Sequence, residues 1–551
     1  MARQLKLVLA QINLLVGAIQ TNTDRVLAAA KEAVDIHQAE LIIFPELTLT
    51  GYPPEDLLLR SSIKPRIEKA LKDIVDADLD AYLVVGYPHK ENNKLYNALS
   101  VIKGRQVLAT YHKQCLPNYQ VFDERRYFVS GNKVCLLEIQ NTKVAFTICE
   151  DLWEEGPMAQ ARDAGAQLLV NINASPYHLN KVSERQKLLE RRSREGKLPI
   201  VYTNLVGGQD ELVFDGASMV VDARGKCKYL APSFQEGLFP LVLNLPENSA
   251  QSVEVPQQRI EITESLEADV YQALILGVRD YVNKNRFAGV VIGLSGGIDS
   301  ALTLAIAVDA LGAERVHAVM MPFDYTSELS RQAAEQQANT LAVDYQVISI
   351  ENIYHSFMTA LAEEFKGLPV DVSEQNIQAR CRGVLLMAIS NKKGLMVLTT
   401  GNKSEIAVGY STLYGDMAGG FDVLKDVSKT MVYRLASYRN QSFQATPREV
   451  IPQVVIDRPP SAELAPDQLD QDILPPYDQL DQILELYVEQ DFSAEAIVAN
   501  GFPEETVRQV LKLVDRNEYK RRQSPIGVRL TQRGFGRDRR YPITNAWELG
   551  D

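Results

Sequence analysis

The sequence has 551 residues, more than one hydrophobic core usually serves, so at least two domains are expected. Apolar residues make up 46% and charged residues 23% of the chain, a composition typical of globular proteins. The net charge of −13 argues against a nucleic-acid-binding protein, because such binding depends on clustered Lys and Arg.

The cysteines and the apolar runs predict a cytoplasmic protein without a membrane partner. Five cysteines are scattered without a C-x-x-C pair, which excludes a disulfide framework or zinc site and favours a reducing compartment. The opening MARQLKLVLAQINLLVG predicts a strand and not a signal peptide, because polar residues interrupt it. No apolar run approaches the roughly 20 residues that span a bilayer.

In the first half, short β-rich runs each end in a polar cluster. They predict strands buried on both faces at 41–44, 82–85, 144–148 and 168–172, with helices at 24–38 and 183–196. Beyond Val221 this pattern weakens.

Three residues with chemistry follow such runs: Glu46 in FPE, Lys113 in YHK and Cys149 in ICED. Each has an ordinary explanation, since Cys is often a small buried hydrophobe and Glu and Lys are usually solvated. Strand ends, however, gather side chains from distant parts of a sequence into one site. A nucleophilic thiol must lose its proton, a carboxylate can take it, and a cation stabilises the charge that develops.

These three contexts resemble the nitrilase superfamily, and the resemblance covers about residues 1–245. It implies an α-β-β-α sandwich, in which Cys149 attacks an amide carbonyl and Glu46 acts as general base. Lys113 would lower the thiol pKa and stabilise the oxyanion, and Glu124 matches a further carboxylate that orients the site.

A change of composition marks the seam between two halves. Residues 245–260, LPENSAQSVEVPQQRI, have linker composition, and an amphipathic helix is predicted from Thr263. We therefore expect domains at 1–245 and 263–551, joined by a linker at 246–262.

The second half begins with a βαβ pattern: strand 290–294, helix 299–311 and strand 316–321. A further strand is predicted at 396–400, and the chain from Tyr477 looks helical. The loop SGGIDS joins the first strand to its helix, where backbone N–H groups and the helix dipole can hold an anion. A plain turn with Asp299 and Ser300 as helix caps is the alternative, and no Walker A Lys-Ser/Thr follows the glycines.

SGGxDS after a hydrophobic strand resembles the ATP pyrophosphatase superfamily. The resemblance implies a doubly wound parallel sheet of the adenine nucleotide alpha hydrolase type, and a loop that grips the pyrophosphate leaving ATP. The expected ATP-binding residues of this loop are Gly293, Leu294, Ser295, Gly296, Gly297, Ile298, Asp299 and Ser300.

Four more segments, at 376–382, 399–405, 414–426 and 460–464, resemble the NAD synthetase family together with that loop. By this resemblance, Thr400 and Lys429 also bind ATP, and Asp299 and Glu405 hold Mg²⁺. Deamido-NAD is expected at Asn376, Glu405 and Lys520. Other basic residues fit either phosphate contacts or surface ion pairs: Arg380, Arg382 and a C-terminal set of Arg529, Arg533, Arg537, Arg539 and Arg540.

Together the two halves resemble the family of glutamine-dependent NAD synthetases. This resemblance implies a ligase with glutamine, ATP and deamido-NAD as substrates, glutamine bound by Tyr119, Ser175 and Lys181, and a homo-oligomer built from dimers, up to an octamer. Two alternatives remain: an amidotransferase of the same ATP class acting on another carboxylate, and a synthetase whose first half is only an inert docking module.

Overall fold

The chain forms two compact units, Met1–Glu264 (unit 1) and Ser265–Asp551 (unit 2). The computed structural model describes residues 3–246, 252–262, 264–441, 443, 447, 449–465 and 468–547. Residues 247–251 of the expected linker, and residue 263, lie outside the described residues. Within the described part of that linker, Val253 and Val255 are buried, and Glu254 forms a bridge to Asn244 of unit 1.

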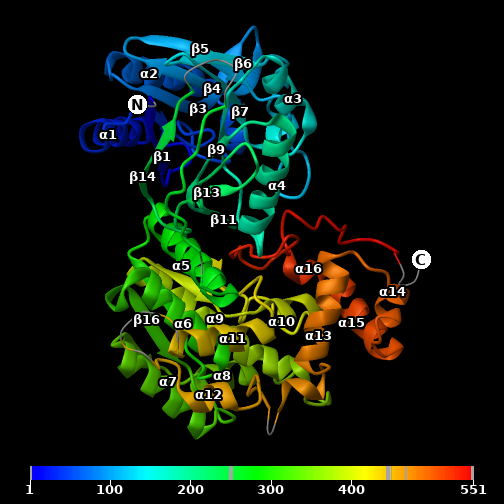
Figure 1. Cartoon of the computed structure of the whole chain (residues 1–551). Helices are drawn as coiled ribbons and strands as arrows, with labels where there is room; N and C mark the ends of the chain where they lie inside the picture. The colour runs from blue at the N-terminus through cyan, green and yellow to red at the C-terminus, as the bar shows by residue number, and fades with distance from the viewer. Residues whose placement is uncertain are drawn as a thin grey trace. The chain divides into compact units, whose positions relative to one another are not determined.

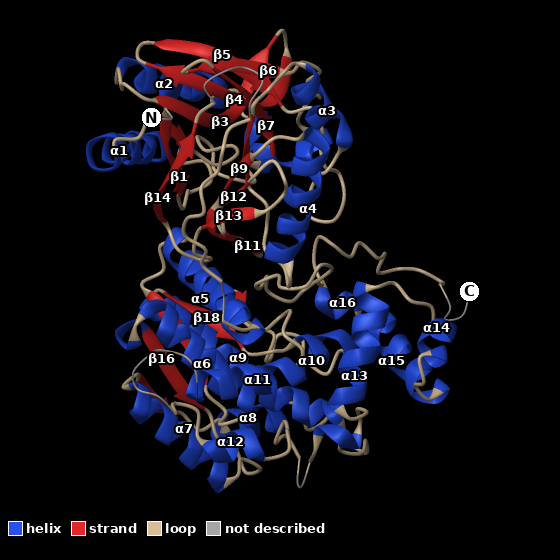
Figure 2. Cartoon of the chain, in the orientation of Figure 1, coloured by secondary structure: helices blue, strands red, loops and turns tan. Residues whose placement is uncertain are grey.

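Unit 1 contains two six-stranded sheets (Figures 1 and 2). The first has the order β14 (Gly237–Asn244), β1 (Gln4–Gln11), β2 (Leu41–Ile43), β3 (Tyr82–Glu91), β4 (Lys94–Lys103), β5 (Gln106–His112). The second has the order β13 (Cys227–Leu230), β12 (Met219–Val221), β9 (Ile200–Asn204), β8 (Leu168–Asn173), β7 (Thr142–Ile148), β6 (Cys135–Ile139). A hairpin of β10 (Val206–Gln209) and β11 (Leu212–Asp215) is separate.

Side chains alternate between the two faces of each strand, and this alternation lets the two sheets of unit 1 pack on each other and on an outer layer of helices on either side. Leu7 and Leu9 of β1 lie in the core between the sheets, whereas Val8 packs outward against α1 (Ile19–His37) and α2 (Ile63–Asp76). On the second sheet, Ala145 packs outward against α3 (Glu155–Asp163) and α4 (Lys181–Gly196). The predicted strands and the α-β-β-α sandwich are confirmed.

Several strands of unit 1 were not predicted from the sequence, namely β4, β5, β6, β9, β10 and β11 before Val221, and β13 and β14 after it. β14 pairs antiparallel with β1 along its whole length, from Gly237↔Gln11 to Asn244↔Gln4. It is an edge strand that contains Pro240, and only one of its faces is well buried, so it lacks the continuous apolar run of the central strands.

Unit 2 is built on a parallel sheet in the order β17 (Asp344–Val347), β16 (Val316–Met320), β15 (Gly289–Gly293), β18 (Leu395–Thr399), β19 (Phe421–Asp422). Val291 and Val397 face α9 (Val372–Lys393), while α6 (Ile298–Leu311) packs on β15 and β16. The predicted doubly wound sheet is confirmed. The strand order reverses between β15 and β18, and such a reversal opens a crevice at the carboxyl ends of the strands.

The remaining helices of unit 2 pack around this sheet or form a separate helical core. They are α5 (Leu266–Lys284), α7 (Glu328–Leu341), α8 (Glu351–Ala360), α10 (Lys403–Val408), α11 (Lys429–Gln441), α12 (Gln453–Asp457), α13 (Tyr477–Leu484), α14 (Ala494–Ala499), α15 (Glu504–Arg516) and α16 (Glu518–Arg521). Helices α10 and α13 to α15 share a second apolar core. The predicted helical character from Tyr477 holds up to Arg521, but residues 522–547 form turns and irregular structure without a helix. Among the described residues no helix is long and apolar enough to cross a membrane.

Candidate active sites

The expected triad of unit 1 meets at the ends of three strands. Glu46 follows β2, Lys113 follows β5, and Cys149 comes directly after β7 as the first residue of a 3₁₀ turn, Cys149–Leu152. All three side chains are buried. Burial opposes the charge of Lys113, but Glu124, Glu46 and, to a smaller extent, the Cys149 thiolate raise its pKa, so the ammonium and the thiol lie within electrostatic reach of each other.

Lys113 is the centre of this site. Its ammonium donates to Glu46 Oε1 at 2.7 Å and to Glu124 Oε1 at 2.9 Å. Tyr52 donates its hydroxyl to the same oxygen of Glu124 at 3.1 Å. Glu46 also accepts from Asn97 Nδ2 at 2.7 Å, a contact that no sequence motif indicated. One cation therefore serves two carboxylates that are sealed from water.

Burial, more than any neighbouring charge, favours the neutral form of the Cys149 thiol. Burial raises the pKa of Cys149 well above its ordinary value, and the negative charge of Glu46 raises it further. Lys113 acts in the expected direction and lowers it, but burial outweighs this effect. Burial also raises the pKa of Glu124, so the site readily holds an extra proton there. Nucleophilic attack by Cys149 thus requires a base to remove its proton.

Two of the three residues expected to bind glutamine, Tyr119 and Lys181, lie within electrostatic reach of Cys149. The charge of Cys149 acts on the pKa of both Tyr119 and Lys181, which places both near the thiol. Tyr119 donates to Glu150 Oε1 at 3.0 Å, and the Lys181 ammonium lies 4.4 Å from the centroid of the Trp153 ring. Ser175 is buried just after β8, where its N–H donates to Asn204. The sequence reasoning did not single out Glu150, Trp153 or Asn204.

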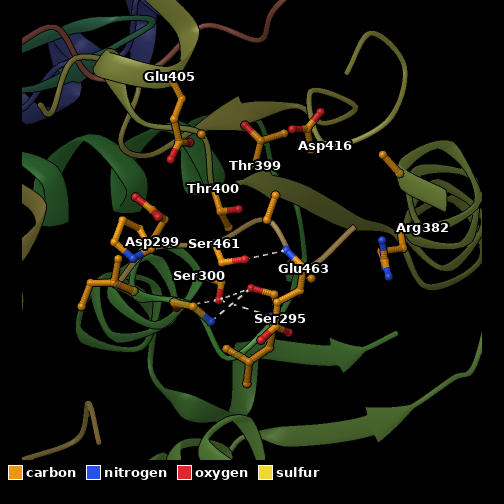
Figure 3. A pocket seen from close by; sticks show the side chains of 18 of the residues that line it. Ser295, Asp299, Ser300, Arg382, Thr399, Thr400, Glu405, Asp416, Ser461 and Glu463 are labelled. Atoms are coloured by element: carbon orange, nitrogen blue, oxygen red, sulfur yellow. Dashed lines mark hydrogen bonds between the residues drawn. The ribbon is translucent and has the colours of Figure 1, made fainter. Parts of the chain in front are cut away.

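In unit 2, a cavity of about 270 Å³ opens where β15 and β18 end (Figure 3). Asp299, Thr400 and Glu405 lie around it. The expected ATP-binding residues that line it are Gly293, Leu294, Ser295, Gly297, Ile298, Asp299, Ser300, Thr400 and Lys429. The cavity therefore lies at the reversal of strand order, where a doubly wound sheet binds its ligands.

The SGGIDS loop forms a tight cradle at the start of α6. Gly297 N donates to Ser295 Oγ at 3.2 Å, and Ser300 Oγ donates to the Gly297 carbonyl at 3.0 Å. Gly296 has φ +81°, and a Cβ there would lie 2.2 Å from the Ser330 carbonyl oxygen. Only glycine fits this position. Of the eight loop residues expected to bind ATP, Gly296 is not among the described residues that line the cavity.

A second shared lysine lies in this cavity. Lys429 Nζ donates to Asp299 Oδ2 at 2.6 Å and to Glu405 Oε1 at 2.9 Å. Burial opposes the charge of Lys429, but the two carboxylates outweigh burial and raise its pKa. Burial, together with Asp299, raises the pKa of Glu405 although Lys429 opposes this. Asn402 fixes Asp299 by donating to its Oδ1 at 2.8 Å.

The carboxylates of Asp299 and Glu405 fit a magnesium site that is completed by a bound nucleotide. Within the described part of the chain, no group of three or more His, Cys, Asp or Glu side chains is arranged to hold a metal. Asp299 and Glu405 supply a pair of hard oxygen ligands, and Mg²⁺ is commonly held by one or two carboxylates plus substrate phosphates. The donor set therefore fits a metal that arrives with a nucleotide, and not a permanent metal cage.

Asn376 and Lys520, which are expected to bind deamido-NAD, do not line the cavity themselves, but both contact the segment that contains the cavity-lining residue Tyr410. Lys520 donates to the carbonyls of Gly409 and Ser411 at 2.8 and 2.9 Å. Asn376 accepts from the Thr412 hydroxyl at 2.8 Å. The structure thus brings these two side chains to one segment, 409–412, which follows α10.

The other basic residues lie in three settings: Arg382 lines the cavity, Arg380 is exposed, and Arg529 and Arg539 of the C-terminal set are buried in ion pairs. Arg382 lines the cavity and donates to the Met321 carbonyl at 3.0 Å, and burial lowers its pKa to about 10. Arg380 is exposed and donates to the Leu413 carbonyl at 3.2 Å. In the C-terminal segment, Arg529 pairs with Asp538, Arg533 with Asp491, and Arg539 with Glu518. The pairs with Asp491 and Glu518 hold the segment on the rest of unit 2, and the Arg529–Asp538 pair lies within the segment.

Comparison with known proteins defines the class of each unit. The carbon–nitrogen hydrolase family model matches residues 6–247, and the NAD synthase family model matches residues 270–524. The chain therefore combines an amide-hydrolase unit with an ATP-dependent synthetase unit.

Whole-chain relatives narrow the class to one family. The chain is 47% identical to the glutamine-dependent NAD(+) synthetase of Acinetobacter baylyi, covering 100% of both chains. It is 45% identical to that of Aquifex aeolicus, covering 98% of this chain and 99% of the relative. A solved structure of the enzyme from Acinetobacter baumannii, in complex with ADP, is 44% identical with a TM-score of 0.79 and 100% coverage of both chains. The protein belongs to the family of glutamine-dependent NAD(+) synthetases.

Proposed function

We propose that this protein makes NAD by amidating deamido-NAD with nitrogen taken from glutamine. Unit 1 hydrolyses glutamine to glutamate and ammonia. Unit 2 adenylates the nicotinate carboxylate of deamido-NAD with ATP and releases pyrophosphate. Ammonia then displaces AMP to give NAD. The C–N bond formed is the carboxamide of nicotinamide, and ATP ends as AMP and pyrophosphate.

In unit 1, Cys149 is the proposed nucleophile and Glu46 the proposed base. Glu46 takes the thiol proton as the sulfur attacks the glutamine amide carbon, and the proton is passed to the leaving ammonia. The Lys113 ammonium stabilises the negative charge on the carbonyl oxygen as it develops. Glu46 then removes a proton from the water that breaks the thioester. Tyr119, Ser175 and Lys181 are proposed to hold the glutamine.

In unit 2, the cradle at the start of α6 is proposed to bind the phosphates of ATP that leave as pyrophosphate, with Thr400 and Lys429 as further contacts. Asp299 and Glu405 would hold Mg²⁺, which neutralises charge on the phosphate oxygens when bound. Asn376, Glu405 and Lys520 are proposed contacts of deamido-NAD.

One observation carries the proposal. Each unit contains a lysine that pairs with two carboxylates, and this lysine lies beside the proposed nucleophile in unit 1 and beside the proposed phosphate-binding loop in unit 2. In unit 1, Lys113 lies within electrostatic reach of a cysteine thiol. In unit 2, Lys429 lies in the same cavity as the phosphate cradle. Amide hydrolysis and nucleotide activation in one chain describe a glutamine-dependent ligase.

The deciding experiment measures NAD formation from deamido-NAD, ATP and Mg²⁺ with either glutamine or ammonium, in wild type and Cys149→Ala. Cys227→Ala is the matched control, because Cys227 is a partly buried cysteine on β13 of the same unit. We expect Cys149→Ala to lose only the glutamine-driven reaction, and Cys227→Ala to keep both.

Two other results would contradict the proposal. Glutamine use by Cys149→Ala would mean that this thiol is not the nucleophile. No NAD from either nitrogen source in wild type would mean that unit 2 acts on another carboxylate. We further propose a cytoplasmic homo-oligomer built from dimers, with the domain boundaries expected above.

A further inference from the structure

Asp151, two residues after the proposed nucleophile, accepts four hydrogen bonds in unit 1. Its Oδ1 accepts from the backbone N–H of Gln114 at 3.0 Å and of Cys115 at 2.9 Å. Its Oδ2 accepts from the backbone N–H of Ile148 at 3.0 Å and from the Tyr111 hydroxyl at 2.7 Å. The side chain is completely buried, and none of these four donors carries a charge.

These four donors come from the two segments that carry the reacting groups. Tyr111, Gln114 and Cys115 flank Lys113, which is the proposed source of positive charge. Ile148 immediately precedes Cys149. One carboxylate therefore ties the backbone around the cation to the backbone around the thiol, although the two segments are separated by more than 30 residues.

The turn at Cys149 needs such support. Cys149 has φ +44°, in the left-handed region that a side chain other than glycine or asparagine seldom adopts. Strained backbone of this kind persists only where surrounding contacts fix it. The bond from Ile148 N–H to Asp151 closes the start of this turn, as a capping residue does.

We propose that Asp151 is a positioning residue for glutamine hydrolysis, which sets the distance between the Lys113 ammonium and the Cys149 thiol by holding both backbones. The proposal rests on the function proposed above for unit 1. Asp151 itself takes no proton and touches no substrate. Because a displacement of about 1 Å can lower a rate about 100-fold, a carboxylate behind the reacting groups can control turnover.

The test is Asp151→Asn in the full-length chain. The Asn Oδ1 can still accept from Gln114 and Cys115, but its NH₂ group faces the N–H of Ile148, so the tie to the Cys149 turn is lost. Asp222→Asn is the matched control. Asp222 also accepts two backbone N–H bonds, from Arg224 and Lys226 at 2.9 Å each, in a turn between β12 and β13.

Five quantities are measured: the rates of glutamine-driven and of ammonium-driven NAD formation, KM for glutamine, the temperature of unfolding, and the pH dependence of Cys149 alkylation by iodoacetamide, read by peptide mass mapping. For Asp151→Asn we expect the glutamine-driven kcat to fall about 10- to 100-fold, with KM changed by less than about threefold and ammonium-driven synthesis unchanged. Asp222→Asn should match wild type in both reactions.

The alkylation profile separates positioning from a charge effect. If Asp151 holds Lys113 near the thiol, its loss moves the alkylation midpoint to higher pH. If it acts only through its negative charge, the neutral Asn moves the midpoint to lower pH, which would overturn the proposal. A lowered unfolding temperature with unchanged glutamine kcat would also overturn it, since Asp151 would then be structural.

A second variant covers the case in which Asp151→Asn does not fold. Tyr111→Phe removes one donor and leaves the three backbone bonds, and we expect a smaller fall in glutamine-driven kcat, about 3- to 10-fold, with ammonium-driven synthesis unchanged. An unchanged kcat and alkylation profile in Tyr111→Phe would then overturn the proposal. If Cys149→Ala retains glutamine-driven synthesis, the proposed function fails, and the role of Asp151 with it.

Discussion

Replacing Lys113 with methionine tests the charge balance of unit 1 directly. Methionine nearly conserves the volume of the side chain but removes the ammonium that lies 2.7 Å from Glu46 and 2.9 Å from Glu124. The three side chains are 0%, 1% and 6% exposed, so water cannot replace the lost cation. Two buried carboxylates would then share one site without a counter-charge.

The free energy of unfolding that Lys113→Met should lose lies at the lower end of the range usual for breaking a buried ion pair. Removing one partner of a buried ion pair costs about 3–5 kcal/mol. Glu46 keeps two donors, Asn97 Nδ2 at 2.7 Å and Ala174 N at 3.1 Å. Glu124, whose pKa burial already raises, can take a proton in place of the ion pair. We therefore expect a loss of about 3 kcal/mol near pH 7, which lowers the unfolding temperature by about 6–12 °C in a unit of this size.

The loss in free energy of unfolding caused by Lys113→Met should grow as the pH rises. Burial raises the pKa of Glu124 above its unfolded value and Lys113 lowers it, so the pKa rises further when the lysine is removed. A carboxyl whose pKa is higher in the folded state binds protons more tightly when folded, so stability falls as pH rises towards the folded pKa. The gap in unfolding temperature between wild type and Lys113→Met should therefore widen from pH 6 to pH 8.

Calorimetry of both proteins at pH 6, 7 and 8 measures this gap. Lys72→Met is the control, because Lys72 pairs with Asp76 on the exposed face of α2 and should unfold like wild type. Glutamine-driven NAD formation should fall at least about 100-fold in Lys113→Met, while ammonium-driven formation is retained. A Lys113→Met protein that unfolds at the wild-type temperature at pH 8 would refute the reasoning.

Three further predictions concern unit 2. Gly296→Ala should lower both the unfolding temperature and NAD formation from either nitrogen source, because its Cβ would lie 2.2 Å from the Ser330 carbonyl oxygen. Gly297→Ala is the control and should unfold like wild type, since the atom nearest to its Cβ would be 3.4 Å away. Equal unfolding temperatures of Gly296→Ala and Gly297→Ala would contradict this prediction. Lys429→Met should reduce NAD formation from both sources by at least about 100-fold while glutamine hydrolysis continues, and a selective loss of hydrolysis would contradict its place in the ATP site. Chelation by EDTA should stop NAD formation from ammonium and Mg²⁺ should restore it, whereas formation that survives exhaustive chelation would exclude a divalent metal at Asp299 and Glu405.

Local patterns in the sequence were enough to predict the buried strands, the βαβ unit and most of the elements near the sites, while the fold class of each unit followed from the resemblance of its motifs to known families. The runs at 41–44, 144–148 and 290–294 are buried on both faces, so each reads as a strand without knowledge of its neighbours. Each carries its polar residues at the strand end, and this local feature identified Glu46, Cys149 and the SGGIDS loop. The strand β14 was not predicted because an edge strand with one exposed face and a proline lacks such an apolar run.

Only the tertiary structure decided how these groups act on one another. Lys113 meets Glu46 across 67 residues of sequence, and Lys429 meets Asp299 across 130. The direction of the Cys149 pKa follows from burial, which outweighs the lysine that the sequence placed beside it. Three of the four donors to Asp151, and both acceptors of Lys520, are backbone groups, which carry no sequence signature. Asn376 accepts from the Thr412 hydroxyl, which no motif connects with it. A sequence records which side chains are present and how they alternate along the chain. Distances, burial and the sharing of one cation between two carboxylates arise only when segments far apart in the sequence pack together.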